Sequence, residues 1–228
     1  MEKLNHYSIE EVIDTYQIIR TKKCQVLNEW LSNTVTDLKD HEVELLKALP
    51  LELEDAQYAW NEEELKMYFI APLIRIANIN QKGVVGTFFE RKLKGIVENI
   101  TISVTCDCMV ATPKLSGNPD VPYFFLQVAP SRPSSSEGVL WTKGKEKKKS
   151  HDPGGQMLAA MILAQSINPT PKPLFGSWIQ GRFWYFTVLI NKEYCVSQPF
   201  DATNYEDLLK IVFILKNLKT YIVNGQKF

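Results

Sequence analysis

Long apolar runs are missing from this 228-residue sequence. No stretch approaches the roughly 18 consecutive apolar residues that identify a membrane-spanning helix, and residues 1–9 lack the apolar segment of a secretion signal. We therefore expect no membrane segment. Cysteine is also scarce, with four residues at Cys24, Cys106, Cys108 and Cys195. That number and spacing exclude a disulfide scaffold and favour a reducing, cytoplasmic setting.

Common catalytic signatures are absent as well. The sequence has no G-x-x-x-x-G-K-[ST] phosphate loop, no G-x-G-x-x-G dinucleotide fingerprint and no G-x-S-x-G nucleophile turn. Its three histidines, His6, His41 and His151, lie far apart in the chain. None has the spacing of a zinc site, so neither histidine-based catalysis nor zinc binding is expected.

What is present is an ordinary globular composition, with 45% hydrophobic and 23% charged residues. The length corresponds to roughly 1.5 domains of typical size. The formal net charge of zero conceals an asymmetry. Residues 1–64 carry 6 basic and 15 acidic side chains, a balance of −9, and residues 65–228 carry 20 basic and 11 acidic, a balance of +9. Either an acidic arm accompanies a nucleic-acid surface, or two solvated faces differ in sign.

Helical patterns fill the first third of the chain. Apolar residues at helical spacing run through residues 9–31, and a shorter helix around residues 43–49 is expected to stop at Pro50. Asn61 can cap a third helix, in which Pro72 should produce a kink or a break.

Strand patterns follow, where Val, Ile, Thr and aromatic residues become frequent. Asp152 and Pro153 then provide the cap and the first residue of a helix. Strands are expected over residues 91–104, 106–111, 122–128, 173–180, 183–190 and 194–197, and a last helix follows them. This order predicts an α/β (α+β) core with a mixed central sheet flanked by helices at residues 61–228, behind a helical N-terminal arm at residues 1–60.

Asp107 fits its surroundings least, because it interrupts the apolar strand of residues 104–110. A buried carboxylate needs a partner or a metal, unless the strand lies at an edge with Asp107 in solvent. Strand alternation places Cys106 and Cys108 together on the face opposite Asp107. We interpret the two cysteines as small buried side chains rather than metal ligands.

The order of motifs around Asp107 resembles the PD-(D/E)XK nuclease superfamily. The strand with Asp107 is followed by the strand of residues 122–130, the helix that contains Gln156, and the hairpin of residues 176–184. The resemblance covers residues 61–222. It implies a restriction-endonuclease-like core, in which a helix precedes a three-stranded meander and a second helix leads to further strands.

The resemblance also implies a site chemistry. An Asp on one strand and a Glu on the next bind Mg²⁺ through oxygen atoms, and a Lys two residues beyond the Glu activates the attacking water. Asp107 matches the Asp, but Gln127 stands at the Glu position and Ala129 at the Lys position. Because the site formed by Asp107, Gln127 and the helix residue Gln156 lacks one negative charge and a base, we expect weak Mg²⁺ binding and crippled catalysis.

Other residues could replace the missing groups. Glu64 or Glu63 could complete the metal ligands, and Lys114 or a lysine of residues 143–149 could serve as the base. The sequence therefore leaves two forms of the site open. One is inactive, and the other is active with relocated residues.

A basic run supplies a second candidate surface. It consists of Lys143, Lys145, Lys147, Lys148 and Lys149, with Trp141 beside it. Such a loop can hold a phosphate backbone while the ring stacks on a base, although a merely solvated loop has the same composition. We expect any nucleic-acid contact to lie on this run and on the basic part after residue 64, with the acidic arm turned away from it or shielding it.

These observations favour a nuclease-like protein with a degenerate catalytic motif, non-catalytic or weakly active, that binds nucleic acid or a protein partner. Two alternatives stay open. One is a working Mg²⁺-dependent DNA nuclease with relocated residues, and the other is an interaction protein with no nucleic-acid role. The geometry around Asp107 distinguishes them.

Overall fold

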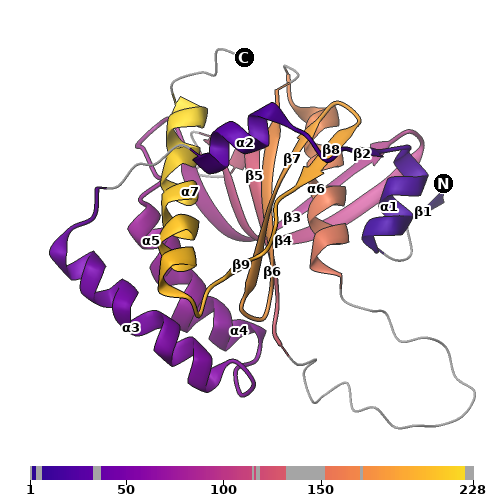
Figure 1. Cartoon of the computed structure of the whole chain (residues 1–228). Helices are drawn as coiled ribbons and strands as arrows, with labels where there is room; N and C mark the ends of the chain where they lie inside the picture. Colours follow the sequence, from indigo (N-terminus) through magenta and orange to yellow (C-terminus); the bar gives the residue numbers. More distant parts are fainter. Residues whose placement is uncertain are drawn as a thin grey trace, which may run out of the picture.

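The computed structural model describes residues 2–3, 7–32, 37–114, 116, 119–131, 152–169 and 172–223. Within these residues, one nine-stranded mixed sheet lies between two layers of helices (Figure 1). Helices α1 (Ile9–Tyr16) and α6 (Pro153–Ile167) cover one face. The other face is covered by α2 (Gln25–Ser32), α3 (Asp40–Ala56), α4 (Glu62–Leu65), the π-helix η1 (Lys66–Ile70), α5 (Ala71–Ala77) and α7 (Tyr205–Val223). The predicted α/β fold class is confirmed.

An antiparallel meander forms the part of the sheet that matters most for the site. It consists of β3 (Gly86–Val97), β4 (Ile100–Pro113) and β5 (Pro119–Ala129). Helix α6 then leads to β6 (Leu174–Gln180), which pairs in parallel with β5. The other strands are β7 (Phe183–Ile190), β8 (Glu193–Val196), β9 (Phe200–Asp201), β1 (Glu2–Lys3) and β2 (Ile19–Arg20). The strand order is β1-β4-β5-β6-β7-β8-β2, with β3 added to β4 and β9 added to β7.

The chain reverses within the predicted strand of residues 91–104, so that prediction is wrong. Glu98 and Asn99 both have positive φ, 49° and 67°, and they form the two-residue turn between β3 and β4. Two such residues match the twist of the flanking strands. The helix start at Asp152 is confirmed, because its Oδ1 accepts a hydrogen bond from the Gly155 N–H at 3.1 Å.

The helical pattern of residues 9–31 proves to be two helices rather than one. Helix α1 ends at Tyr16, and its C-cap, Gln17, has a left-handed φ of 51°. The chain then forms β2, in which Ile19 pairs with Glu193 of β8, before α2 begins. A sheet edge distant in sequence thus provides backbone partners that compete with the helix.

The two prolines of the helical region behave differently. Pro50 lies inside α3 and does not end it. Leu46, Leu49 and Leu53 of the same helix are buried, and burial of this face offsets the roughly 3 kcal/mol that an interior proline costs. Pro72 lies in the first turn of α5, and the helical run continues from α4 through η1 into α5, so the predicted kink or break takes the form of a π-helical turn directly before this helix.

The N-terminal helices belong to the common core. Trp30 is fully buried, and its Nε1 donates a hydrogen bond to the Ile214 carbonyl oxygen at 2.9 Å. On the other face, Val12 packs in the same cluster as α6. Gly155 permits this approach, because a Cβ there would collide with the carbonyl oxygen of Tyr7. The described helices α1 and α2 therefore pack into the core on the two faces of the sheet.

Candidate functional site

The alternation of side chains along β4 breaks at Asp107. Cys106 packs in the core beneath α6, whereas Cys108 packs in the core beneath the opposite helices. The prediction that these cysteines share a face is therefore wrong, although both are buried. Asp107 is 7% exposed, and its Oδ2 accepts a hydrogen bond from the Val128 N–H at 2.7 Å. The carboxylate thus accepts a β5 hydrogen bond that a backbone carbonyl of β4 would otherwise accept. Because β4 pairs with both β3 and β5, Asp107 does not lie at a solvated edge of the sheet.

Glu90 lies opposite Asp107 on β3, between the pairs Phe89–Cys108 and Arg91–Cys106. Its φ of 51° is in the left-handed region. For a residue other than glycine this conformation costs about 1–2 kcal/mol, and such strain concentrates at functional sites. The strained backbone places the Glu90 Oε1 2.7 Å from the Lys66 Nζ.

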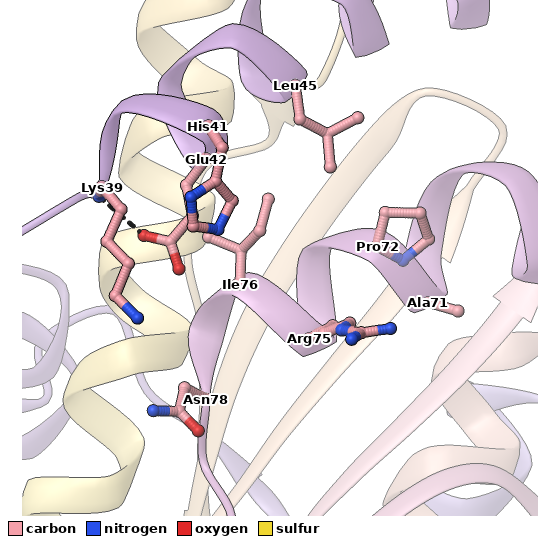
Figure 2. Close-up of a pocket in the computed structure, with 9 residues that line it drawn as sticks. All are labelled: Lys39, His41, Glu42, Leu45, Ala71, Pro72, Arg75, Ile76 and Asn78. Carbon is pink, nitrogen blue, oxygen red and sulfur yellow. Dashed lines mark hydrogen bonds between the residues drawn. The ribbon is translucent and has the colours of Figure 1, made fainter.

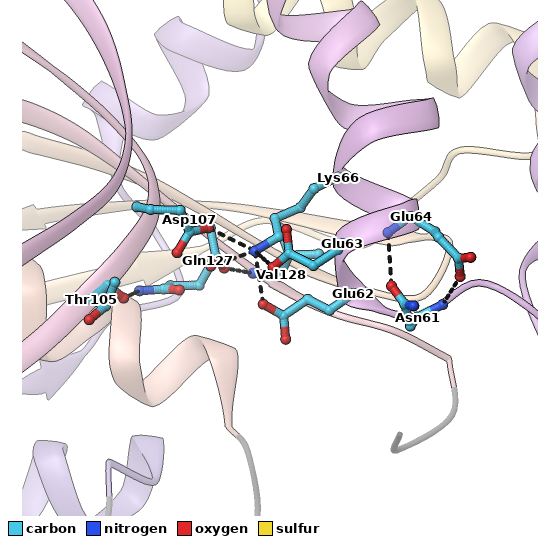
Figure 3. A network of polar contacts seen from close by, with 10 residues as sticks. Asn61, Glu62, Glu63, Glu64, Lys66, Thr105, Asp107, Gln127 and Val128 are labelled. Carbon is cyan, nitrogen blue, oxygen red and sulfur yellow. Dashed lines mark hydrogen bonds and ion pairs between the residues drawn. The ribbon is translucent and has the colours of Figure 1, made fainter. Parts of the chain in front are cut away.

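Lys66 is the first residue of η1, and its ammonium lies among carboxylates that include Glu62, Glu63 and Asp107 (Figure 3). The Nζ is 3.1 Å from Glu62, 2.7 Å from Glu63, 2.7 Å from Glu90 and 3.5 Å from Asp107. We call these five residues the Lys66 cluster, and its charge is −3 when every group is ionised. Turns of π-helix also concentrate at functional sites. Three backbone irregularities therefore meet at the Lys66 cluster: the π-helix η1, the left-handed φ of Glu90 and the break in alternation at Asp107.

Burial and charge shift two pKa values within the Lys66 cluster. Burial lowers the pKa of Lys66, but its hydrogen bonds to Glu63 and Glu90 and the field of Asp107 outweigh burial and raise that pKa above its ordinary value. Lys66 therefore stays charged. Burial raises the pKa of Asp107 to about 6, although Lys66 and the Val128 N–H oppose that rise. Asp107 therefore gains or loses its charge close to neutral pH.

A cavity of about 220 Å³ opens beside the Lys66 cluster. Glu63 and Glu90 form its rim, with 73% and 54% of their side chains exposed, whereas Lys66 lies deeper, at 12%. The rest of the lining consists of Asp107 and the apolar residues Met67, Ile70, Ala71, Phe89, Cys108, Leu126 and Val128. The arrangement is an apolar cavity with an acidic rim, and we call it the Asp107 cavity.

Gln127 does not join Asp107 in this site. It is almost fully buried, and its Nε2 donates a hydrogen bond to the Thr105 carbonyl oxygen at 2.7 Å. Its neighbours Leu126 and Val128 line the Asp107 cavity, so alternation along β5 directs Gln127 to the other face. The expectation that Asp107 and Gln127 converge on one face is therefore wrong, and the cause is the break in alternation at Asp107.

Glu64 is also absent from the cluster. Its carboxylate accepts the Asn61 N–H at 2.8 Å and its own N–H donates to Asn61 Oδ1 at 2.9 Å, so it caps α4. The adjacent Glu63, the alternative from the sequence, reaches Lys66 instead. Lys114 pairs with Asp120 at 3.4 Å and does not line the Asp107 cavity.

The remaining predicted residues lie elsewhere. Gln156 is in the first turn of α6, whose buried side chains pack in the cluster on the opposite side of the sheet from α4 and η1. The basic run and the ring beside it, Lys143, Lys145, Lys147, Lys148, Lys149 and Trp141, lie outside the described residues. The structure therefore neither joins these residues to the Asp107 cavity nor separates them from it.

Sequence reasoning missed Lys66 and Glu90. One signal was available for Lys66, since it follows Glu62 and Glu63 at helical spacings of four and three, which favour ion pairs. Lys66 also adjoins Leu65 and lies near Phe69, which are both buried. A lysine between buried residues on a short acidic helix indicates an internal partner. Nothing in the local sequence marks Glu90.

The carboxylates do not form a metal site as they are arranged. Mg²⁺ requires oxygen ligands at about 2.0–2.1 Å in near-octahedral geometry. Within the part of the chain that the structure describes, no three Asp, Glu, His or Cys side chains have an arrangement that could hold a metal ion. The Lys66 ammonium occupies the point on which the carboxylates converge. These residues therefore fit an ammonium group, and no reaction step is assigned to Mg²⁺.

A second cavity, of about 720 Å³, lies between α3 and α5 (Figure 2). Exposed Lys39, His41 and Arg75 line it together with apolar side chains. Its left-handed residue, Asn78, is an ordinary helix cap. The Glu42 carboxylate in its lining is also largely buried and lies 3.9 Å from Lys216 Nζ. Because this cavity lacks the backbone strain of Glu90 and the raised carboxyl pKa of Asp107, we assign the functional site to the smaller cavity.

Comparisons with known proteins identify no relative that could support or contradict this assignment. No protein-family model matches the chain. No curated protein sequence matches it either. The function proposed below is therefore argued from the Lys66 cluster, the Asp107 cavity and the order of the strands.

Proposed function

We propose that this protein is a nuclease-like binding protein whose Asp107 cavity receives a partner without Mg²⁺-dependent cleavage of phosphodiesters. The observation that carries the proposal is the position of Lys66, whose ammonium lies within 4 Å of four carboxylates. This ammonium occupies the point on which the carboxylates converge, so a divalent cation cannot take up the octahedral ligand geometry that Mg²⁺ needs there. The acidic residues of a nuclease-like site thereby become a structural ion-pair cluster.

The order of elements supports the nuclease-like part of the proposal. A helical segment, α4–η1–α5, precedes the meander β3-β4-β5, and α6 then leads to β6 parallel to β5. The PD-(D/E)XK resemblance implies a helix before a three-stranded meander and a second helix that leads to further strands. The placement of Asp107 and Gln127 on different faces counts against a PD-(D/E)XK active site, so the likeness concerns the order of elements alone. Fold alone does not fix function, so the absence of catalysis is argued from the site.

The site lacks the lysine base of a nuclease centre. Such a lysine must lose its proton near neutral pH, but the pKa of Lys66 is raised, so its ammonium has no free lone pair. Asp107, with its pKa of about 6, is the one member of the cluster placed to accept a proton near neutral pH, and its two oxygens already contact Lys66 Nζ and the Val128 N–H. Ala129 has no ionisable group. With a charge of −3, the cluster also repels a phosphate group. Binding of an uncharged or cationic group is consistent with all three properties.

A working nuclease is the second candidate, and one observation favours it. Lys66 places a lysine 3.5 Å from Asp107, as a relocated catalytic lysine would. Its raised pKa argues against that role. Cleavage assays separate the two candidates directly.

With Mg²⁺ or Mn²⁺, the purified protein is expected to leave duplex DNA, single-stranded DNA and RNA intact. Loss of acid–base help alone slows hydrolysis by about 10²–10⁴-fold. Gel assays of the parent, of Asp107→Asn and of the control Glu64→Gln, which lies outside the cluster, provide the measurement. Metal-dependent cleavage by the parent and by Glu64→Gln that is lost in Asp107→Asn would overturn the proposal.

The acidic residues 1–64 contribute directly to the Asp107 site. Glu62 and Glu63 belong to them and lie within the Lys66 cluster. The expected relation between these acidic residues and the basic run of residues 143–149 stays a prediction, because that run lies outside the described residues. At the Asp107 cavity itself, the charge favours a protein partner.

Two features bear on where the protein acts. None of the described helices is long and apolar enough to cross a membrane. All four cysteines are free, which supports the proposal of a reducing, cytoplasmic setting.

A further inference from the structure

The Asp107 cavity has a chemistry that selects its occupant. Ligand pockets for whole small molecules span about 300–1,000 Å³, whereas this cavity holds about 220 Å³. That volume is too small for a nucleotide or a typical cofactor. It suits one group of side-chain size, inserted from a larger molecule.

The walls of the cavity favour an apolar group. Ile70, Leu126 and Val128 are buried side chains that form its inner part. Met67 and Phe89 lie at its outer part and are 67% and 48% exposed. Burial of such exposed apolar surface stabilises a complex, and methionine adapts its shape to different partners.

The rim of the cavity favours a cation beside that apolar group. Glu63 and Glu90 share the single ammonium of Lys66 with two further carboxylates, so the cluster keeps an excess of negative charge. Both rim side chains are largely exposed and can meet a second cation without its full desolvation. The same excess charge disfavours the phosphates of a nucleic acid.

We propose that the Asp107 cavity binds a segment of a partner protein that inserts one apolar side chain and places a lysine or arginine beside Glu63 and Glu90. This inference rests on the proposed function, because a site occupied by Mg²⁺ and a phosphodiester would leave no room for such a segment. Its specificity comes from two parts. The apolar wall selects the inserted side chain, and the acidic rim selects the charge of its neighbours.

Methionine methyl groups provide a direct readout. In protein labelled with [methyl-¹³C]methionine, Met67 reports on the cavity, while Met109, Met157 and Met161 lie in the cluster on the other side of the sheet and serve as internal references. The probes are three capped tripeptide amides: acetyl-Lys-Leu-Lys, acetyl-Lys-Ser-Lys and acetyl-Glu-Leu-Glu. A short oligothymidylate is the nucleic-acid probe.

The expected result is a saturable shift of the Met67 signal with the Lys-Leu-Lys peptide, while the three reference signals stay in place. The Lys-Ser-Lys and Glu-Leu-Glu peptides should bind more weakly, because each lacks one of the two recognised features. In the double variant Glu63→Gln/Glu90→Gln, loss of two exposed ion pairs should weaken Lys-Leu-Lys binding by about three- to tenfold. The control Glu44→Gln, which removes an exposed pair on α3, should bind as the parent does.

A second variant distinguishes loss of binding from loss of folding. Ala71→Leu adds apolar bulk to the cavity wall without changing charge, and it should abolish the Met67 shift while the reference signals keep their native positions. The inference is overturned if Met67 does not respond, if the Glu-Leu-Glu peptide binds as well as Lys-Leu-Lys, or if oligothymidylate moves Met67. Those outcomes would not contradict the predicted absence of cleavage. Metal-dependent cleavage would overturn the proposed function, independently of the peptide-binding results.

Discussion

Replacement of Lys66 by methionine is expected to lower the free energy of unfolding by about 3 kcal/mol at about pH 8. Methionine keeps the length and apolar stem of the side chain but leaves four carboxylates without their shared cation. Most of the loss arises at Asp107, which is buried. Glu63 and Glu90 are exposed to solvent, so their repulsion is screened and adds little.

Urea denaturation at two pH values tests this effect. The matched control is Lys47→Met, which breaks the exposed pair with Glu44 at 2.8 Å and should change stability by about 0.5 kcal/mol or less. Near pH 5 the loss in Lys66→Met should shrink, because protonation removes the charge of Asp107. A loss at pH 8 no larger than that of Lys47→Met would show that the cluster does not stabilise the fold.

Replacement of Asp107 by asparagine is expected to stabilise the protein by about 1–3 kcal/mol at about pH 8. The pKa of Asp107 is raised from 3.8 to about 6, mainly by burial. The folded protein therefore binds this proton more tightly than the unfolded chain does. The stability that the proton contributes is fully present below pH 3.8 and is lost as the pH rises through about 6. Asparagine keeps an oxygen that can accept the Val128 N–H but carries no charge to bury.

The measurement is the free energy of unfolding between about pH 4 and pH 8 for the parent, for Asp107→Asn and for Asp120→Asn. Asp120 is an exposed partner of Lys114, so its variant should follow the parent. The decline of stability between about pH 4 and pH 6 should disappear in Asp107→Asn alone. An Asp107→Asn protein that is less stable than the parent near pH 8 would contradict the burial cost assigned to the carboxylate.

Local signals explain which parts of this fold the sequence could predict. The cap at Asp152 and the strand of residues 183–190 each depend on a few adjacent residues, and both are present. Near Pro72 the α-helical pattern changes to a π-helical turn, but the helical run continues. The prediction that a helix ends at Pro50 was wrong, because the packing of α3 outweighs the helix-breaking preference of one proline. The turn at Glu98 and Asn99 was missed because strand-forming residues continue on both sides of it.

The site was only half predictable, for a related reason. Asp107 was identified because a charged residue in an apolar strand needs a partner. Its partners could not be identified, because Lys66 lies 41 residues away and reaches Asp107 from a π-helical turn. The left-handed conformation of Glu90 leaves no composition signal either. Gln127 was assigned to the wrong face because strict alternation was assumed through the residue that breaks it.

The hydrogen bond between Trp30 and Ile214 joins residues 184 positions apart, which sets the order in which the chain can fold during synthesis. At about 5–20 residues per second, a ribosome needs about 10–40 s to make the intervening segment. The indole ring of Trp30 has no partner in α7 for that whole interval. Trp30 also contacts the rings of Phe124, Phe175 and Phe186, which are made before α7. The sheet can therefore receive the Trp30 ring first, and α7 docks last and completes its burial. A truncation before α7 would leave the Trp30 indole N–H without its carbonyl partner.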